Sequence, residues 1–181
     1  MDTIIKIIIV IVVLFIVYII GKRNKFVKLK NSVINAKSSI DVYLKQRFDL
    51  IPNLIEVVKT YSKYEEDLFT KIVEARNAYM NSMSLKDATT VNTELNKLIA
   101  LAESYPELKA SEQYLHLQKQ LVKMENQLQA ARRVYNSEVE VYNNAIMVFP
   151  ANILAGIFGY KEEKYFELEN PEEAKNIEVK L

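Results

Sequence analysis

The chain has no cysteine, a single histidine and only three glycines among 181 residues. Without cysteine there is no disulfide framework, thiol nucleophile or zinc–thiolate site, and one histidine does not make a multi-histidine metal centre. The glycines, Gly21, Gly156 and Gly159, form no phosphate-binding loop. With 24 basic and 23 acidic residues there is no general basic field for nucleic acid. We therefore expect no catalytic residues, no cofactor, no metal, no nucleic-acid partner and no small-molecule substrate.

One long apolar run lies near the start of the chain. Sixteen of the seventeen residues from 4 to 20 are apolar, and a helix of that length is about 25 Å long, at the short end of what spans a bilayer. The fourteen residues from 7 to 20 leave no polar face, which argues against a soluble core helix. We predict a membrane anchor over residues 1–21, defined by Ile4, Lys6, Ile7, Phe15, Tyr18 and Ile20.

The residues that follow the run decide between a retained anchor and a cleaved signal peptide, and they orient the anchor. The sequence Gly-Lys-Arg-Asn-Lys offers no small-x-small cleavage site, so a retained anchor is favoured. By the positive-inside rule, the cations after the run predict an outside N-terminus and a cytoplasmic C-terminal domain. These cations are Lys22, Arg23, Lys25, Lys28 and Lys30.

Apolar residues recur in alternating steps of three and four through most of the remaining chain. This spacing is the seam of amphipathic helices, and it predicts helical segments over 26–43, 54–79, 85–102 and 114–146. Pro52 predicts a kink or short break around 49–52. Ser84 and Ser111 are expected N-caps, and the last helix is expected to stop before Phe149 and Pro150.

No stretch alternates with a period of two for long enough to form a sheet. The sequence therefore predicts an all-α fold, in which the transmembrane helix leads into an antiparallel, coiled-coil-like bundle of three to four long helices over residues 22–149. For residues 150–181 we expect one helical turn followed by an extended tail. That tail is expected to pack Phe158, Tyr165 and Phe166 back onto the bundle.

Five separated motifs add a family resemblance. They are IDVYLKQRFDLIPNLIEVVKTYSKYE from Ile40, EARN from Glu74, LAESYPELKAS from Leu101, ARRVYN from Ala131 and VFPANILAGIFGY from Val148. Together with the anchor, they resemble the LemA family of bacterial membrane proteins. The resemblance implies a cytoplasmic helical bundle with its N-terminus outside. It implies no established enzymatic or transport role, and it supplies no catalytic residues.

Two groups of polar residues are candidate structural or interaction positions. Asp49, Pro52 and Asn53 form either a structural joint, in which Asp49 caps freed amides, or a kink that docks a partner. Arg132, Asn136 and Asn143 fall within about 40° of one another on one helix. They are expected to form an inter-helix polar network with Arg76 and Asn77, and the alternative is a solvated flank.

We interpret the chain as a non-enzymatic, membrane-anchored cytoplasmic bundle that acts as a scaffold or adaptor for protein–protein interaction. The alternative is an accessory or regulatory subunit of a membrane enzyme such as a protease, contacted through the anchor helix. A third interpretation is a lipid-surface module that uses the cations from Lys22 to Lys30. The expected partners are the lipid bilayer and another protein, and a homo-oligomer is compatible with the sequence.

Overall fold

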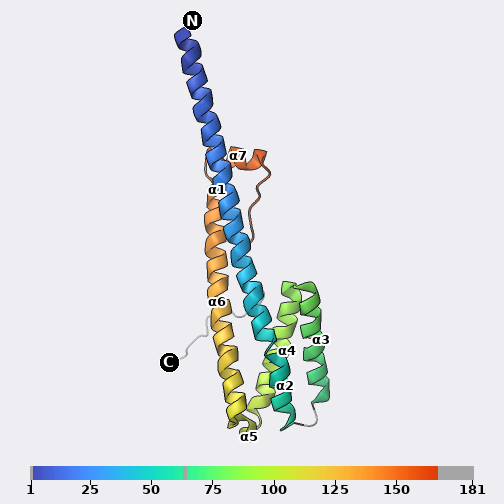
Figure 1. Cartoon of the computed structure of the whole chain (residues 1–181). Helices are drawn as coiled ribbons and strands as arrows, with labels where there is room; N and C mark the ends of the chain where they lie inside the picture. The colour runs from blue at the N-terminus through green and yellow to red at the C-terminus, as the bar shows by residue number, and fades with distance from the viewer. Residues whose placement is uncertain (1, 63–64, 167–181) are drawn as a thin grey trace, which may run out of the picture. The chain divides into compact units, whose positions relative to one another are not determined.

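The structure is a computed structural model that describes residues 2–62 and 65–166 (Figure 1). Within this part of the chain every regular element is a helix, which confirms the predicted all-α fold. The predicted tail beyond residue 166 lies outside the described residues. The helices are α1 (Asp2–Phe48), α2 (Ile51–Lys59), α3 (Glu66–Ser82), α4 (Leu85–Glu103), α5 (Pro106–Lys109), α6 (Glu112–Met147) and α7 (Ala151–Ile157).

The chain folds into two compact units. Unit 1 comprises residues 1–37 and 132–181, and unit 2 comprises residues 38–131. The two longest helices, α1 with 47 residues and α6 with 36 residues, each contribute to both units. Anchor and first bundle helix are therefore one continuous helix.

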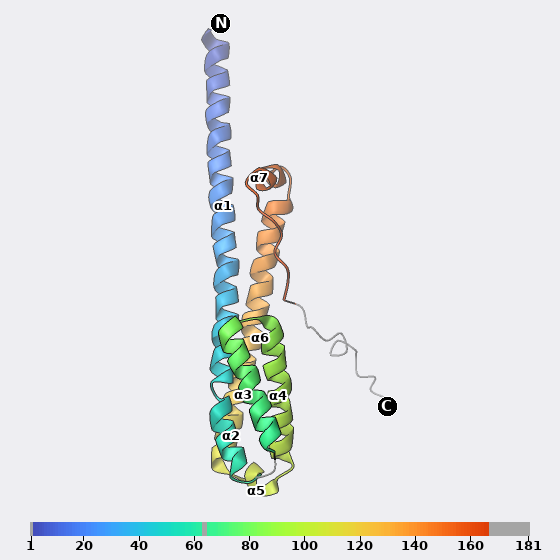
Figure 2. The ribbon, with the colours of Figure 1, turned by 90° about the vertical axis from the view of Figure 1, so that its right-hand side faces the viewer.

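In unit 1, α1 and α6 lie side by side, as both ribbon views show (Figures 1 and 2). Aliphatic and aromatic side chains from both helices and from α7 form one apolar cluster, because each helix has only one apolar stripe to bury. The ring of Phe26 also meets the ring of Tyr160 edge-on, with centroids 5.2 Å apart. The fully packed members of the cluster are Phe26, Val33, Val139, Tyr142, Ile146, Ala151, Leu154 and Ala155.

Unit 2 packs α2, α3, α4 and α5 with the adjoining parts of α1 and α6. The rings of Phe48 and Tyr79 meet edge-on in its core, with centroids 4.9 Å apart and planes at 88°. Helices α3 and α4 form a hairpin, in which Met83 takes the left-handed conformation and Ser84 is the N-cap of α4. The Ser84 hydroxyl accepts a hydrogen bond from the Asp87 amide at 3.1 Å, which confirms the predicted N-cap.

The break at Pro52 is confirmed, because α1 ends at Phe48 and α2 begins at Ile51 with Pro52 in its first turn. The predicted continuous helix over 54–79 is wrong: α2 ends at Lys59 and α3 begins at Glu66. Threonine and serine at 60 and 62 have low helix propensity. Ser62 is instead buried and accepts a hydrogen bond from the hydroxyl of Tyr105, at 3.4 Å.

Candidate functional site

Two asparagines of α6 bind the backbone of the segment that follows α7. The Asn143 amide donates to the Glu163 carbonyl at 2.9 Å, and its oxygen accepts from the Glu163 N–H at 2.9 Å. Asn136 forms the same pair with Phe166, at 3.1 and 2.7 Å. We call residues 160–166 with their α6 partners the clasp. An extended segment outside a sheet needs partners for its backbone groups, and the side-chain amides supply them.

A tyrosine precedes each asparagine and adds a further hydrogen bond. The Tyr142 hydroxyl donates to the carbonyl of Lys161, and the Tyr135 hydroxyl donates to the carbonyl of Lys164, both at 3.0 Å. The two pairs belong to a Val-Tyr-Asn tripeptide that occurs at 134–136 and again at 141–143. Seven residues of α-helix rise about 10.5 Å, and three extended residues span about 10 Å. The seven-residue repeat therefore matches a three-residue repeat of the tail.

Gly159 turns the chain from α7 into the clasp. Its φ of 73° lies in the left-handed region, which glycine adopts without a Cβ clash. The Gly159 N–H donates to Gly156 at 3.2 Å, and the Tyr160 N–H donates to Ala155 at 2.9 Å. These two bonds form a Schellman motif, which ends the helix and reverses the chain.

An ion pair and two aromatic contacts complete the clasp. The Lys30 ammonium of α1 pairs with the Glu163 carboxylate, and this hydrogen bond raises the pKa of Lys30. The same ammonium lies 5.4 Å from the ring centre of Tyr142, whose pKa is raised by burial. The Arg132 guanidinium lies 4.6 Å from the ring centre of Phe166, as expected for a tail that packs back. The Tyr165 side chain is 46% exposed, so the prediction that it packs was wrong.

The partners predicted for the asparagines were also wrong. Asn136 and Asn143 were expected to bond across to the helix that carries Arg76 and Asn77, but their amides bond to the tail backbone. Asn143 is 6% exposed, so the alternative of a solvated flank does not describe it either. The residue type was the available signal, because one amide offers a donor and an acceptor together.

Arg76 instead closes the joint between α1 and α2. Its Nη2 pairs with the Asp49 carboxylate at 2.7 Å, and its Nε donates to the Phe48 carbonyl at 3.0 Å. Asp49 was expected to cap the amides freed near Pro52, but Leu50 is the N-cap of α2 and no side chain bonds there. Asp49 thus anchors the arginine that satisfies an end carbonyl of α1.

The other joint candidates lie at the surface. Pro52 and Asn53 are exposed in the first turn of α2, and Asn77, next to Arg76, is also exposed. The structure therefore brings Asp49 and Arg76 together, whereas within residues 2–62 and 65–166 no hydrogen bond places Asn53 or Asn77 in the joint.

The valines of the Val-Tyr-Asn repeat face away from the clasp. Val134 and Val141 are 54% and 47% exposed, and their seven-residue spacing keeps them on one face of α6. We call this pair the valine stripe. A recess of about 380 Å³ adjoins Val141. It is lined by Lys22, Lys25, Phe26, Val141, Asn144, Ala145, Val148 and Ala151.

The N-terminal half of α1 is long and apolar enough to cross a membrane. An 18-residue window has a mean hydropathy of 3.2, and none of it is buried within the described structure. The predicted anchor residues Ile4, Ile7, Phe15 and Ile20 are all at least half exposed. The Lys22 ammonium lies 5.5 Å from the ring centre of Tyr18, at the end of the apolar run.

An exposed apolar helix that continues into an all-helical bundle defines a membrane-anchored helical protein. The model of the LemA family matches residues 36–181, and the chain belongs to this family.

Curated relatives resemble the chain along most of its length. It is 25% identical to magnetosome protein MamQ 2 of Paramagnetospirillum magneticum, over 86% of this chain and 68% of the relative. It is 23% identical to magnetosome protein MamQ of Magnetospirillum gryphiswaldense, over 85% of this chain and 68% of the relative. It is 26% identical to protein LemA of Metamycoplasma hominis, over 79% of this chain and 67% of the relative.

Proposed function

We propose that the protein is a non-enzymatic, membrane-anchored scaffold whose bundle lies on the cytoplasmic side and binds a helix of another protein through the valine stripe. This proposal rests on the observation that two edges of α6 in unit 1 have different surroundings. One edge, with Asn136 and Asn143, holds the tail. The valine stripe lies on another edge and exposes two apolar side chains at heptad spacing.

Heptad spacing is what a partner helix recognises. In paired helices apolar side chains recur about every 3.5 residues on average, at two positions of each heptad, and the valine stripe supplies one of these two positions. The names of the MamQ relatives refer to a cellular structure and not to a reaction, which supports a structural role.

The test of the partner surface compares three full-length variants in native membranes. The first carries Val134→Glu and Val141→Glu, the second has its anchor residues shuffled in order, and the matched control carries Glu140→Lys on exposed α6 surface. After crosslinking, quantitative mass spectrometry measures the proteins recovered with each.

A scaffold should lose a defined set of partners in the double glutamate variant and keep it in the other two. Loss of partners in the shuffled-anchor variant alone would overturn the scaffold proposal. It would favour an accessory subunit that is contacted through its anchor. Recovery that is equal in all three variants would overturn the proposed surface.

The proposed orientation has its own test, because the absence of native cysteine makes any introduced thiol a unique reporter. Five cations follow the apolar run, and by the positive-inside rule they support a bundle on the cytoplasmic side. In intact cells, an impermeant maleimide should label Asp2→Cys and leave Ser137→Cys unlabelled until lysis. The reverse labelling pattern would overturn the orientation.

A further inference from the structure

The corner between α6 and α7 exposes large apolar side chains beside the anchor. Phe149 is 75% exposed, Ile157 is 71% exposed and Val148 is 61% exposed. Outside the anchor, these are the three highest values for large apolar side chains in the described part of the chain. Exposed apolar side chains gathered at one place mark a binding surface.

Helix α7 has two apolar faces, and among the described residues only one of them is buried. Ala151, Leu154 and Ala155 are buried in the cluster of unit 1. Ile153 and Ile157, four residues apart and so on one face, are 55% and 71% exposed. Together with Val148 and Phe149, the two isoleucines form what we call the corner patch.

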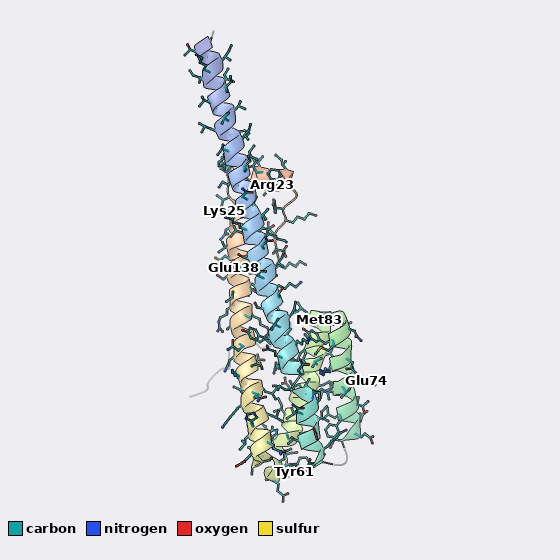
Figure 3. The ribbon with its side chains drawn as sticks, in the orientation of Figure 1. Arg23, Lys25, Tyr61, Glu74, Met83 and Glu138 are labelled. Atoms are coloured by element: carbon teal, nitrogen blue, oxygen red, sulfur yellow. The ribbon has the colours of Figure 1, made fainter. Side chains whose placement is uncertain are left out.

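Contacts with α1 fix the corner at the point where the apolar run gives way to cations. Ile19, in the last turn of that run, packs against the cluster that buries α7. The Arg23 guanidinium lies 5.8 Å from the ring centre of Phe158. In Figure 1, α7 crosses beside α1 at that level, and Figure 3 labels Arg23 and Lys25 there.

For a membrane span over residues 4–20, this level coincides with the membrane surface. A span over residues 4–20 ends one turn before Arg23, so the corner lies among the headgroups and upper acyl chains. Short amphipathic elements bind there with apolar side chains among the acyl chains and cations on the phosphates. The corner patch supplies the apolar side chains, and Lys22, Arg23 and Lys25 supply the cations.

We propose that the corner patch inserts into the interfacial layer of the leaflet from which α1 emerges, which makes α7 a second, monotopic membrane contact. The lipid bilayer is the occupant because the corner patch is continuous with the surface of the anchor. The proposal rests on the anchor and does not depend on a protein partner at the valine stripe.

The test places a fluorescent nitrobenzoxadiazole label on single cysteines of the full chain in vesicles of phosphatidylcholine and phosphatidylglycerol. The labelled variants are Ile157→Cys and Phe149→Cys. The matched control is Val134→Cys, on α6 in the same unit and 54% exposed. Fourteen helical residues, about 21 Å, separate Val134 from Val148. Quenching is measured with nitroxides on the lipid headgroup, at a shallow acyl position and at a deep one.

Labels at 157 and 149 should be quenched several-fold more strongly than the label at 134, most by the shallow nitroxide. Equal quenching at all three positions would overturn the proposal. Protection from aqueous iodide without lipid quenching would assign the corner patch to a second copy of the chain, and would overturn the lipid assignment. None of the labelled side chains is buried, so labelling does not disturb the core.

Discussion

Asn143 binds both backbone groups of Glu163, donating to its carbonyl and accepting from its N–H. The Glu163 carboxylate meanwhile pairs with Lys30 of α1. One tail residue thereby connects both long helices of unit 1. The tail therefore contributes to the packing of α1 on α6, in addition to the apolar cluster.

The first prediction concerns the asparagine. Asn143→Ala removes both hydrogen bonds and leaves the Glu163 backbone without its partner, which should cost about 1–3 kcal/mol. Hydrogen exchange at the Glu163 amide should accelerate by roughly 5- to 150-fold. The control is Asn144→Ala, at the adjacent exposed position. Equal exchange in both variants would contradict the clasp.

The second prediction concerns the joint. Arg76→Ala removes the hydrogen bond to the Phe48 carbonyl and the pair with Asp49, and should lower the free energy of unfolding by about 1 kcal/mol. The value is modest because Asp49 is 47% exposed and the pair is solvated. Denaturant melts measure it, and Asn77→Ala in the same motif should change stability by less than about 0.5 kcal/mol. Equal losses of stability in the two variants would show that Arg76 does not stabilise the joint.

The third prediction concerns Tyr79, whose hydroxyl is buried without a hydrogen-bond partner among the described residues. Tyr79→Phe should therefore raise stability at neutral pH by on the order of 1 kcal/mol. Burial raises the pKa of Tyr79 from 10.0 to about 12. Between pH 10 and 12 the unfolded chain ionises at Tyr79 before the folded chain does. The free energy of unfolding therefore keeps its full value below pH 10 and falls as the pH rises through 12.

Denaturant melts at several pH values test this sign. The stability lost by the native protein between pH 10 and 12 should exceed the loss in the phenylalanine variant. Parallel losses would show that Tyr79 titrates alike in the folded and unfolded chains.

The fourth prediction concerns Met83, which ends α3 with a φ of 50°. A side chain in the left-handed region is strained, and this position is 45% exposed, so little packing is lost on its removal. Met83→Gly should raise the thermal midpoint, in line with a gain of about 0.5–1 kcal/mol. Met83→Ala keeps the Cβ and should give no such gain. An identical rise in both variants would exclude backbone strain as the cause.

Local chemistry was readable from the sequence. Pro52 and Ser84 act on their own neighbours, because the proline ring and the capping hydroxyl reach only a few residues along the chain. The helix break and the N-cap therefore lie where the sequence placed them. The unpredicted split after Lys59 reflects a competing tertiary contact, the burial of Ser62 against Tyr105.

The clasp could be read only in part. The positions of Asn136 and Asn143 beside the core seam were visible, and so was the Val-Tyr-Asn repeat, which sequence reasoning overlooked. Their partners lie 20 to 30 residues away in a segment without periodicity. No pattern in such a segment indicates which backbone groups it presents.

The hydrogen bonds that α6 makes in the clasp constrain the length of the tail but not the identity of its side chains. All six hydrogen bonds from α6 end on backbone atoms of the tail, so side chains at positions such as 161 and 164 are free to vary. Removing one residue between Gly159 and Glu163 would put both asparagines out of register together, whereas inserting three would let the tail advance by one whole repeat. The clasp therefore tolerates drift in tail sequence and selects against single-residue insertions and deletions.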